Sequence, residues 1–115
     1  MRELGVGHSE RVYHNAMLAH FDRANVTCRS EVVCPVMYLG RCVGTGQADL
    51  VLGNTVIELK ASGLPSSHAL PQLRRYIRSL NELEKKKYSG VVINFNQRTG
   101  KVEHVLDSPE EFGIK

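Results

Sequence analysis

The stretch Asp49-Leu-Val-Leu-Gly-Asn-Thr-Val-Ile-Glu-Leu-Lys60 decides the fold of this chain. Gly53-Asn54 stands between two apolar runs, and a Gly-Asn pair there predicts a two-residue hairpin turn with positive φ at the glycine. We therefore expect a strand from Cys42 to Leu52 that turns directly into an antiparallel strand from Thr55 to Ala61.

The predicted hairpin brings two carboxylates together. Its register places Asp49 opposite Glu58, and side-chain alternation adds Lys60 to the same face. The other face is apolar, with Leu50, Leu52, Ile57 and Leu59. Opposed residues have Cβ atoms about 4.5–5.5 Å apart, and like charges placed there are destabilising. A cation between the carboxylates is the best explanation, and their hard oxygen atoms suit Mg²⁺ or Mn²⁺.

Lys60 adds chemistry to this face. Beside a bound cation, it would orient or deprotonate a water, or stabilise charge that develops on a phosphate. The alternative is a surface hairpin in which Glu58 and Lys60 are solvated and Asp49 ends a strand. The apolar neighbours weigh against that alternative, because an unpaired carboxylate among them is costly.

The remaining elements give an α/β domain with a central mixed β-sheet flanked by helices. Capping and apolar spacing predict helices, and short apolar runs predict strands. In chain order we expect a helix over 9–25, strands over 30–40, 42–52 and 55–61, a helix over 66–87, and strands over 90–95 and 101–106. Pro35 favours an edge strand or a bulge. One domain over 1–106 and a polar tail over 107–115 follow.

Composition limits the class of protein. Hydrophobic residues make up 42% and charged residues 23% of the 115, which excludes a disordered chain. We expect neither a membrane-spanning helix nor a secretory signal, because no apolar stretch in the sequence is long enough for either. Three cysteines without CxxC spacing exclude a full disulfide framework and a zinc site built from cysteine pairs. We expect an intracellular, reducing compartment, either cytoplasm or nucleus.

Positive charge gathers in one part of the chain. The net charge is only +3, but residues 61–101 carry eight lysines and arginines against two glutamates. Such a local excess is an electrostatic footprint for a polyanion, while a solvated helix face is the plainer interpretation. The candidates for backbone contacts with nucleic acid are Arg74, Arg75, Arg78, Lys85, Lys86 and Lys87.

Several motifs in order resemble one known family. Asp49 followed by Glu58-Leu59-Lys60 resembles the metal-binding signature of the PD-(D/E)xK nuclease superfamily. Gly7-His-Ser-Glu-Arg-Val-Tyr13 resembles the motif of the GxxExxY proteins, a branch of that superfamily. Gln72-Leu-Arg-Arg-Tyr76 resembles the QxxxY motif of RecB-like and lambda-exonuclease-like members. The resemblance runs from about Glu3 to Leu106.

The resemblance implies roles for individual residues. Asp49 and Glu58 would bind the metal, with the backbone carbonyl of Leu59 completing the site, and Lys60 would be the catalytic lysine. Glu10 would reach the metal or a water on it. The resemblance also implies that two residues of the second helix position the scissile phosphate or the catalytic groups, namely Gln72 and Tyr76.

The predicted function is metal-dependent hydrolysis of phosphodiester bonds in DNA, by exonuclease or structure-directed action rather than sequence-specific cutting. RNA as substrate and a homo-oligomer stay open. Two other classes also stay open. One is a nucleic-acid-binding module that has kept the fold without turnover, and the other is a protein-interaction module whose Glu58 and Lys60 are structural.

Overall fold

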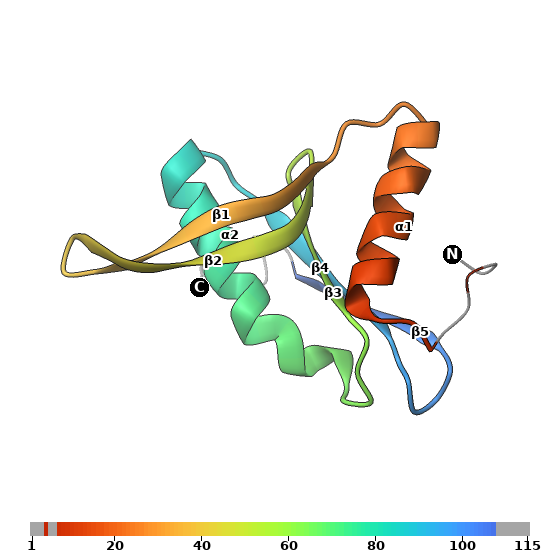
Figure 1. Ribbon diagram of the computed structural model, residues 1–115. Coiled ribbons are helices and arrows are strands. Elements are labelled where there is room, and N and C mark those ends of the chain that lie inside the picture. The colour runs from red at the N-terminus through yellow and green to blue at the C-terminus, as the bar shows by residue number, and fades with distance from the viewer. Residues whose placement is uncertain (1–3, 5–6, 108–115) are drawn as a thin grey trace.

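A mixed sheet lies between helices in the computed structural model, which describes Leu4 and residues 7–107 (Figure 1). The elements of this part of the chain are α1 (Glu10–Arg23), β1 (Arg29–Tyr38), β2 (Arg41–Leu52), β3 (Thr55–Lys60), a 3₁₀ turn (Ser66–Ala69), α2 (Leu70–Glu84), β4 (Ser89–Phe95) and β5 (Val102–Asp107). The strands lie in the order β1-β2-β3-β4-β5. Only β3 and β4 are parallel, because α2 connects them by a crossover. The predicted α/β class with a mixed sheet is confirmed.

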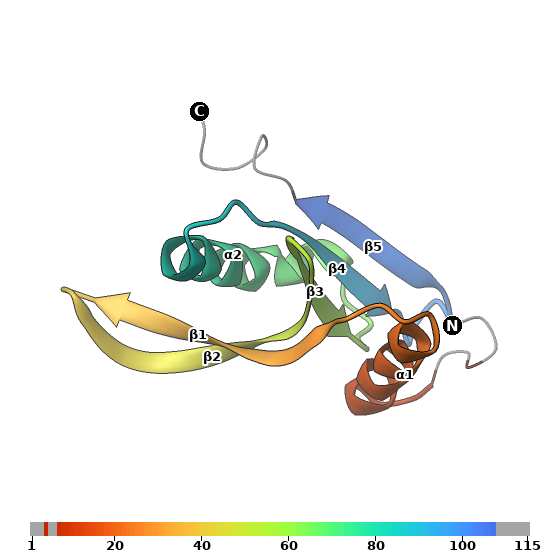
Figure 2. The same cartoon turned by 90° about the horizontal axis from the view of Figure 1, so that it is seen from above.

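The two helices cover opposite faces of the sheet (Figure 2). On one face Tyr13 of α1 is fully buried and stacks on Phe95, with ring centroids 3.8 Å apart. On the other face α2 buries a stripe spaced at i, i+4 and i+7, formed by Leu73, Ile77 and Leu80. The side chain of Ser9 caps α1 by accepting a hydrogen bond from the Val12 amide.

The predicted hairpin register is confirmed. Leu52 pairs with Thr55, Val51 with Val56 and Leu50 with Ile57. Gly53 has φ +59°, the left-handed conformation that the turn requires and that glycine adopts at little cost.

The predicted helix over 66–87 is wrong at both ends. Residues Ser66–Ala69 form a 3₁₀ turn, and α2 begins only at Leu70, with Pro71 in its first turn. The helix stops at Glu84 because Lys85 adopts a left-handed conformation with φ +56°. Lys85, Lys86 and Lys87 therefore lie in the loop after α2, where all three are exposed.

Strand β1 forms one edge of the sheet, as Pro35 predicts. Together with β2 it builds a long two-stranded ribbon that extends beyond the rest of the sheet (Figures 1 and 2). Its register shifts between Val36 and Met37. Among the described residues, neither helix has the length and apolar character needed to cross a membrane.

Candidate active site

The two carboxylates lie where β2 separates from β3. Regular pairing of these strands ends at Leu50 and Ile57. Beyond that pair, the Asp49 amide donates to Glu58 Oε1 at 3.1 Å, and the Leu59 amide donates to Asp49 Oδ2 at 2.8 Å. Each carboxylate thus accepts a hydrogen bond from the backbone of the opposite strand, and the two side chains are neighbours.

Glu58 is buried, with only 3% of its surface exposed. Burial raises its pKa from 4.5 to about 8, and the negative charge of Asp49 acts in the same direction. The charge of Glu10 raises the pKa further, while Lys60 lowers it. The interpretation of Glu58 as a solvated residue of a surface hairpin is therefore wrong. Glu10 itself is exposed, in the first turn of α1.

The backbone of Leu59 faces the same place. In a strand, the N–H and C=O of one residue point to the same neighbouring strand. Because the Leu59 N–H points to Asp49, its carbonyl also faces the side of β2, beyond the end of the regular pairing. Two carboxylates and one carbonyl are thereby directed to one region.

A row of polar side chains runs from β3 to α2. Lys60 Nζ donates to Gln72 Oε1 at 3.2 Å, and Gln72 Nε2 donates to the Tyr76 hydroxyl at 3.1 Å. Gln72 and Tyr76 are one turn apart on α2, so they share a helix face. Burial raises the pKa of Tyr76, and the charge of Glu58 adds to that rise. The ammonium group of Lys60 is thus held beside Glu58 on one face of the sheet.

Sequence reasoning missed Gly46. A Cβ atom added there would lie 2.7 Å from Cε1 and 3.0 Å from the hydroxyl of Tyr76, closer than real Cβ contacts. The absence of a side chain on β2 therefore lets the Tyr76 ring pack against the strand. A glycine inside a strand is the available sequence signal, because it often marks a close approach.

Comparison with protein families identifies this arrangement. The model of the PD-(D/E)XK nuclease superfamily matches residues 1–105. The chain belongs to this superfamily. Its members are generally nucleases, which are hydrolases that act on nucleic acid and typically use divalent metal ions. Searches of curated proteins and of solved structures returned no match.

The donor atoms suit the divalent cation that PD-(D/E)XK nucleases typically use. Carboxylate and carbonyl oxygens are hard ligands, and a bound cation would favour the charged form of Glu58, which burial and the charge of Asp49 disfavour. The Leu59 carbonyl matters to this fit, since no cluster of three His, Cys, Asp or Glu side chains suited to a metal occurs in the described part of the chain.

The basic residues of this PD-(D/E)XK chain do not all lie near the row of Lys60, Gln72 and Tyr76. Arg75 and Arg78 are exposed on α2. Arg74 makes an ion pair with the buried Asp107 at 3.1 Å, although 41% of its side chain stays exposed. The exposed lysine run begins at Lys85, nine residues after Tyr76. At the rise of an α-helix, Lys85 is about 14 Å from Tyr76 along the axis of α2. The structure therefore does not bring the lysine run to Lys60.

Proposed function

We propose that this protein is a metal-dependent nuclease that hydrolyses phosphodiester bonds in DNA. The observation that carries the proposal is the buried Glu58 paired with the half-buried Asp49, beside a lysine that Gln72 holds in place. A buried acid with a pKa of about 8 next to a second carboxylate is a costly arrangement for a purely structural hairpin. The same arrangement suits a site that binds a cation and a phosphate together, because the carboxylates bind the cation and the lysine binds the phosphate.

We assign the metal site to Asp49, Glu58 and the Leu59 carbonyl, with Glu10 reaching a water on the metal. The ion is Mg²⁺ or Mn²⁺, and when bound it supplies the Lewis acidity that phosphodiester hydrolysis needs. The exposure of Glu10, in the first turn of α1, leaves it accessible to an ion or to a water, and its charge already acts on Glu58.

Lys60, Gln72 and Tyr76 complete the site. As an ammonium, Lys60 Nζ donates a hydrogen bond to a phosphate oxygen and stabilises charge that develops there. One water is consumed: its oxygen bonds to phosphorus, the P–O bond to one sugar breaks, and that oxygen leaves with a proton. Gln72 and Tyr76 fix the direction of the lysine. Arg75, Arg78 and the three lysines of the loop after α2 bind the backbone without reading sequence.

The finer assignments rest on motifs. The QxxxY motif, Gln72 to Tyr76, favours DNA ends or a DNA structure over a specific sequence, by analogy with related nucleases. The GxxExxY motif supports membership of the GxxExxY branch of the superfamily, since its Tyr13 lies in the core and its Glu10 lies on the surface. Three free thiols favour an intracellular protein.

Cleavage of end-labelled DNA tests the proposal. Single- and double-stranded substrates are incubated with Mn²⁺, Mg²⁺ or EDTA, and we expect products with the metals only. Asp49→Asn and Lys60→Ala should abolish them. Asp22→Asn and Lys101→Ala are matched controls, because both residues are exposed outside the site, and they should cut like the wild type.

The pattern of products separates the alternatives. Progressive shortening from an end indicates an exonuclease, and internal fragments indicate an endonuclease. A folded wild-type protein that binds DNA in a salt-sensitive manner but never cuts it would overturn the proposal and favour the inactive binding module.

A further inference from the structure

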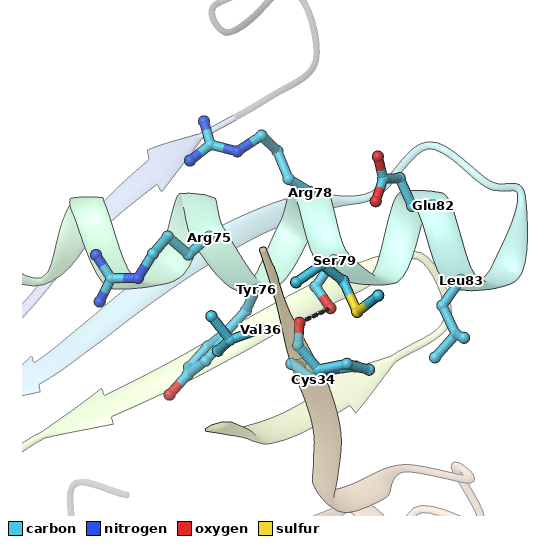
Figure 3. A pocket seen from close by; sticks show the side chains of 10 residues that line it. Cys34, Val36, Arg75, Tyr76, Arg78, Ser79, Glu82 and Leu83 are labelled. Atoms are coloured by element: carbon cyan, nitrogen blue, oxygen red, sulfur yellow. Dashed lines mark hydrogen bonds between the residues drawn. The ribbon is translucent and has the colours of Figure 1, made fainter. Parts of the chain in front are cut away.

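A groove lies between the edge strand β1 and α2 (Figure 3). It adjoins the row of Lys60, Gln72 and Tyr76, because Tyr76 lines it. Its volume is about 490 Å³, within the range of about 300–1,000 Å³ typical of ligand pockets. Pro35, Val36 and Met37 line it from the strand, and Tyr76 and Leu83 line it from the helix.

Tyr76 belongs to both the groove and the row. Its hydroxyl accepts the hydrogen bond from Gln72, while its ring forms part of the groove lining. The groove therefore begins where the row of polar side chains ends. Gln72 alone separates Lys60 from Tyr76 in this row, so a strand whose phosphate lay at Lys60 would have its next nucleotide within reach of Tyr76.

The chemistry of the groove suits a nucleotide. Val36, Met37 and Leu83 are about half exposed, and they offer apolar surface to a flat base. Arg75 stands at the Tyr76 end of the groove, where Figure 3 shows its guanidinium beyond the tyrosine. A cation next to an apolar surface complements a nucleotide, which joins an anionic phosphate to a base with an apolar face.

The groove is preformed. Ser79 on α2 donates a hydrogen bond to the backbone carbonyl of Pro35 at 3.1 Å, and this bond ties the edge strand to the helix. Pro35 has no N–H for a further β-strand, so β-addition at this position is disfavoured.

We propose that this groove binds one unpaired nucleobase of the substrate strand, next to the scissile phosphate. The proposal rests on the proposed nuclease function and deepens it: the enzyme requires an unpaired nucleotide at the cut. A base inside a blunt duplex is stacked and paired, so it enters the groove only after it is pulled out at a cost of a few kcal/mol.

Val36→Asp tests the groove, and Val33→Asp is its matched control. Both valines lie on β1 with similar exposure, 48% and 50%, but only Val36 lines the groove. Binding is measured by fluorescence anisotropy in EDTA. The ligands are a labelled single-stranded DNA and a set of the same DNA in which one abasic site stands at a different position in each member. Binding is thereby separated from cleavage.

We expect the abasic site to weaken wild-type binding about tenfold at one position near the cut, and little elsewhere. Val36→Asp should weaken binding of the intact strand similarly and lose the dependence on the abasic site, while Val33→Asp behaves like the wild type. An RNA strand tested in parallel shows whether the base alone is recognised.

Equal binding of intact and abasic strands at every position would overturn the groove proposal, even where the protein cuts DNA. A change of oligomeric state in Val36→Asp without a change in binding would also overturn it, and would assign the groove to a second copy. Base-dependent binding without metal-dependent cutting would support the groove and overturn the nuclease function.

Discussion

Replacing Glu58 by glutamine should change how the stability of the metal-free protein depends on pH. Glu58 is 3% exposed, and burial together with the charge of Asp49 raises its pKa from 4.5 to about 8. The folded protein therefore keeps a proton on Glu58 at pH values where the unfolded chain has released it. Stability then falls as pH rises, because the folded state binds more protons than the unfolded state.

The raised pKa sets the size of the effect. The stability linked to this proton is fully present below pH 4.5, declines as pH rises toward 8 and is absent above that value. One pKa unit corresponds to about 1.4 kcal/mol, so the decline is at most about 5 kcal/mol. Glutamine has no proton to release and keeps an oxygen that accepts the Asp49 amide, so Glu58→Gln should lack this decline.

Urea unfolding in EDTA at pH 4.5 and pH 8.5 measures the difference. At pH 4.5 both proteins carry an uncharged side chain at position 58, and their free energies of unfolding should agree closely. At pH 8.5 the variant should be more stable by up to about 5 kcal/mol. Every other side chain is the same in both proteins, so the comparison at each pH isolates position 58. A difference between the two proteins that is the same at both pH values would refute the reasoning.

Two further predictions concern other sites. Gly46→Ala should lower the rate of cleavage about 10- to 100-fold, because the new Cβ displaces the Tyr76 ring. Gly44→Ala is the control and should cut normally, since its new Cβ meets nothing within 4 Å. Equal initial rates of cleavage for the two variants would contradict the prediction. The ion pair with Arg29 lowers the pKa of Glu84 to about 2, so stability from this group is present above pH 4.5 and lost as pH falls through 2. Unfolding followed by circular dichroism should therefore show a steeper loss of stability between pH 4.5 and 2 in the wild type than in Glu84→Gln.

The hairpin could be predicted because its signals are local. Gly53-Asn54 fixes the turn, and alternation fixes which side chains share a face with Glu58. The end of α2 carried no such signal. Lys85, Lys86 and Lys87 are all good helix formers, and only the left-handed conformation of Lys85 ends the helix before them.

Contacts between distant segments could not be predicted from the sequence. Gly46 and Tyr76 are thirty residues apart, and they meet because α2 packs on the face of the sheet that contains β2. Tyr76 has the spacing of the buried stripe, yet its hydroxyl joins the polar row instead. One side chain thus serves both packing and the site, which periodicity alone does not reveal.

The separation of β2 from β3 explains why carboxylates stand at this point. β2 pairs with β3 only from Leu50 to Leu52, and in the neighbouring strand β1 Glu31 has φ +53°. The amides of Asp49 and Leu59 then lack strand partners, and an unpaired buried amide is costly. The carboxylates of Glu58 and Asp49 accept these amides.

Each carboxylate therefore has two roles, since it accepts a backbone hydrogen bond and it carries a charge for the active site. Different substitutions of the same residue separate these two roles. Asp49→Ala removes the charge and the acceptor of the Leu59 amide together, so a loss of activity would be confounded with a loss of folding. Asp49→Asn keeps an oxygen that can accept this amide and removes only the charge. Because removal of that charge also lowers the pKa of Glu58, the metal-free Asn variant should be at least as stable as the wild type at neutral pH. An Asn variant that unfolds like the wild type but does not cut DNA would show that catalysis needs the charge at position 49. One that is markedly destabilised would contradict this prediction, because it would show that folding itself needs the negative charge at position 49.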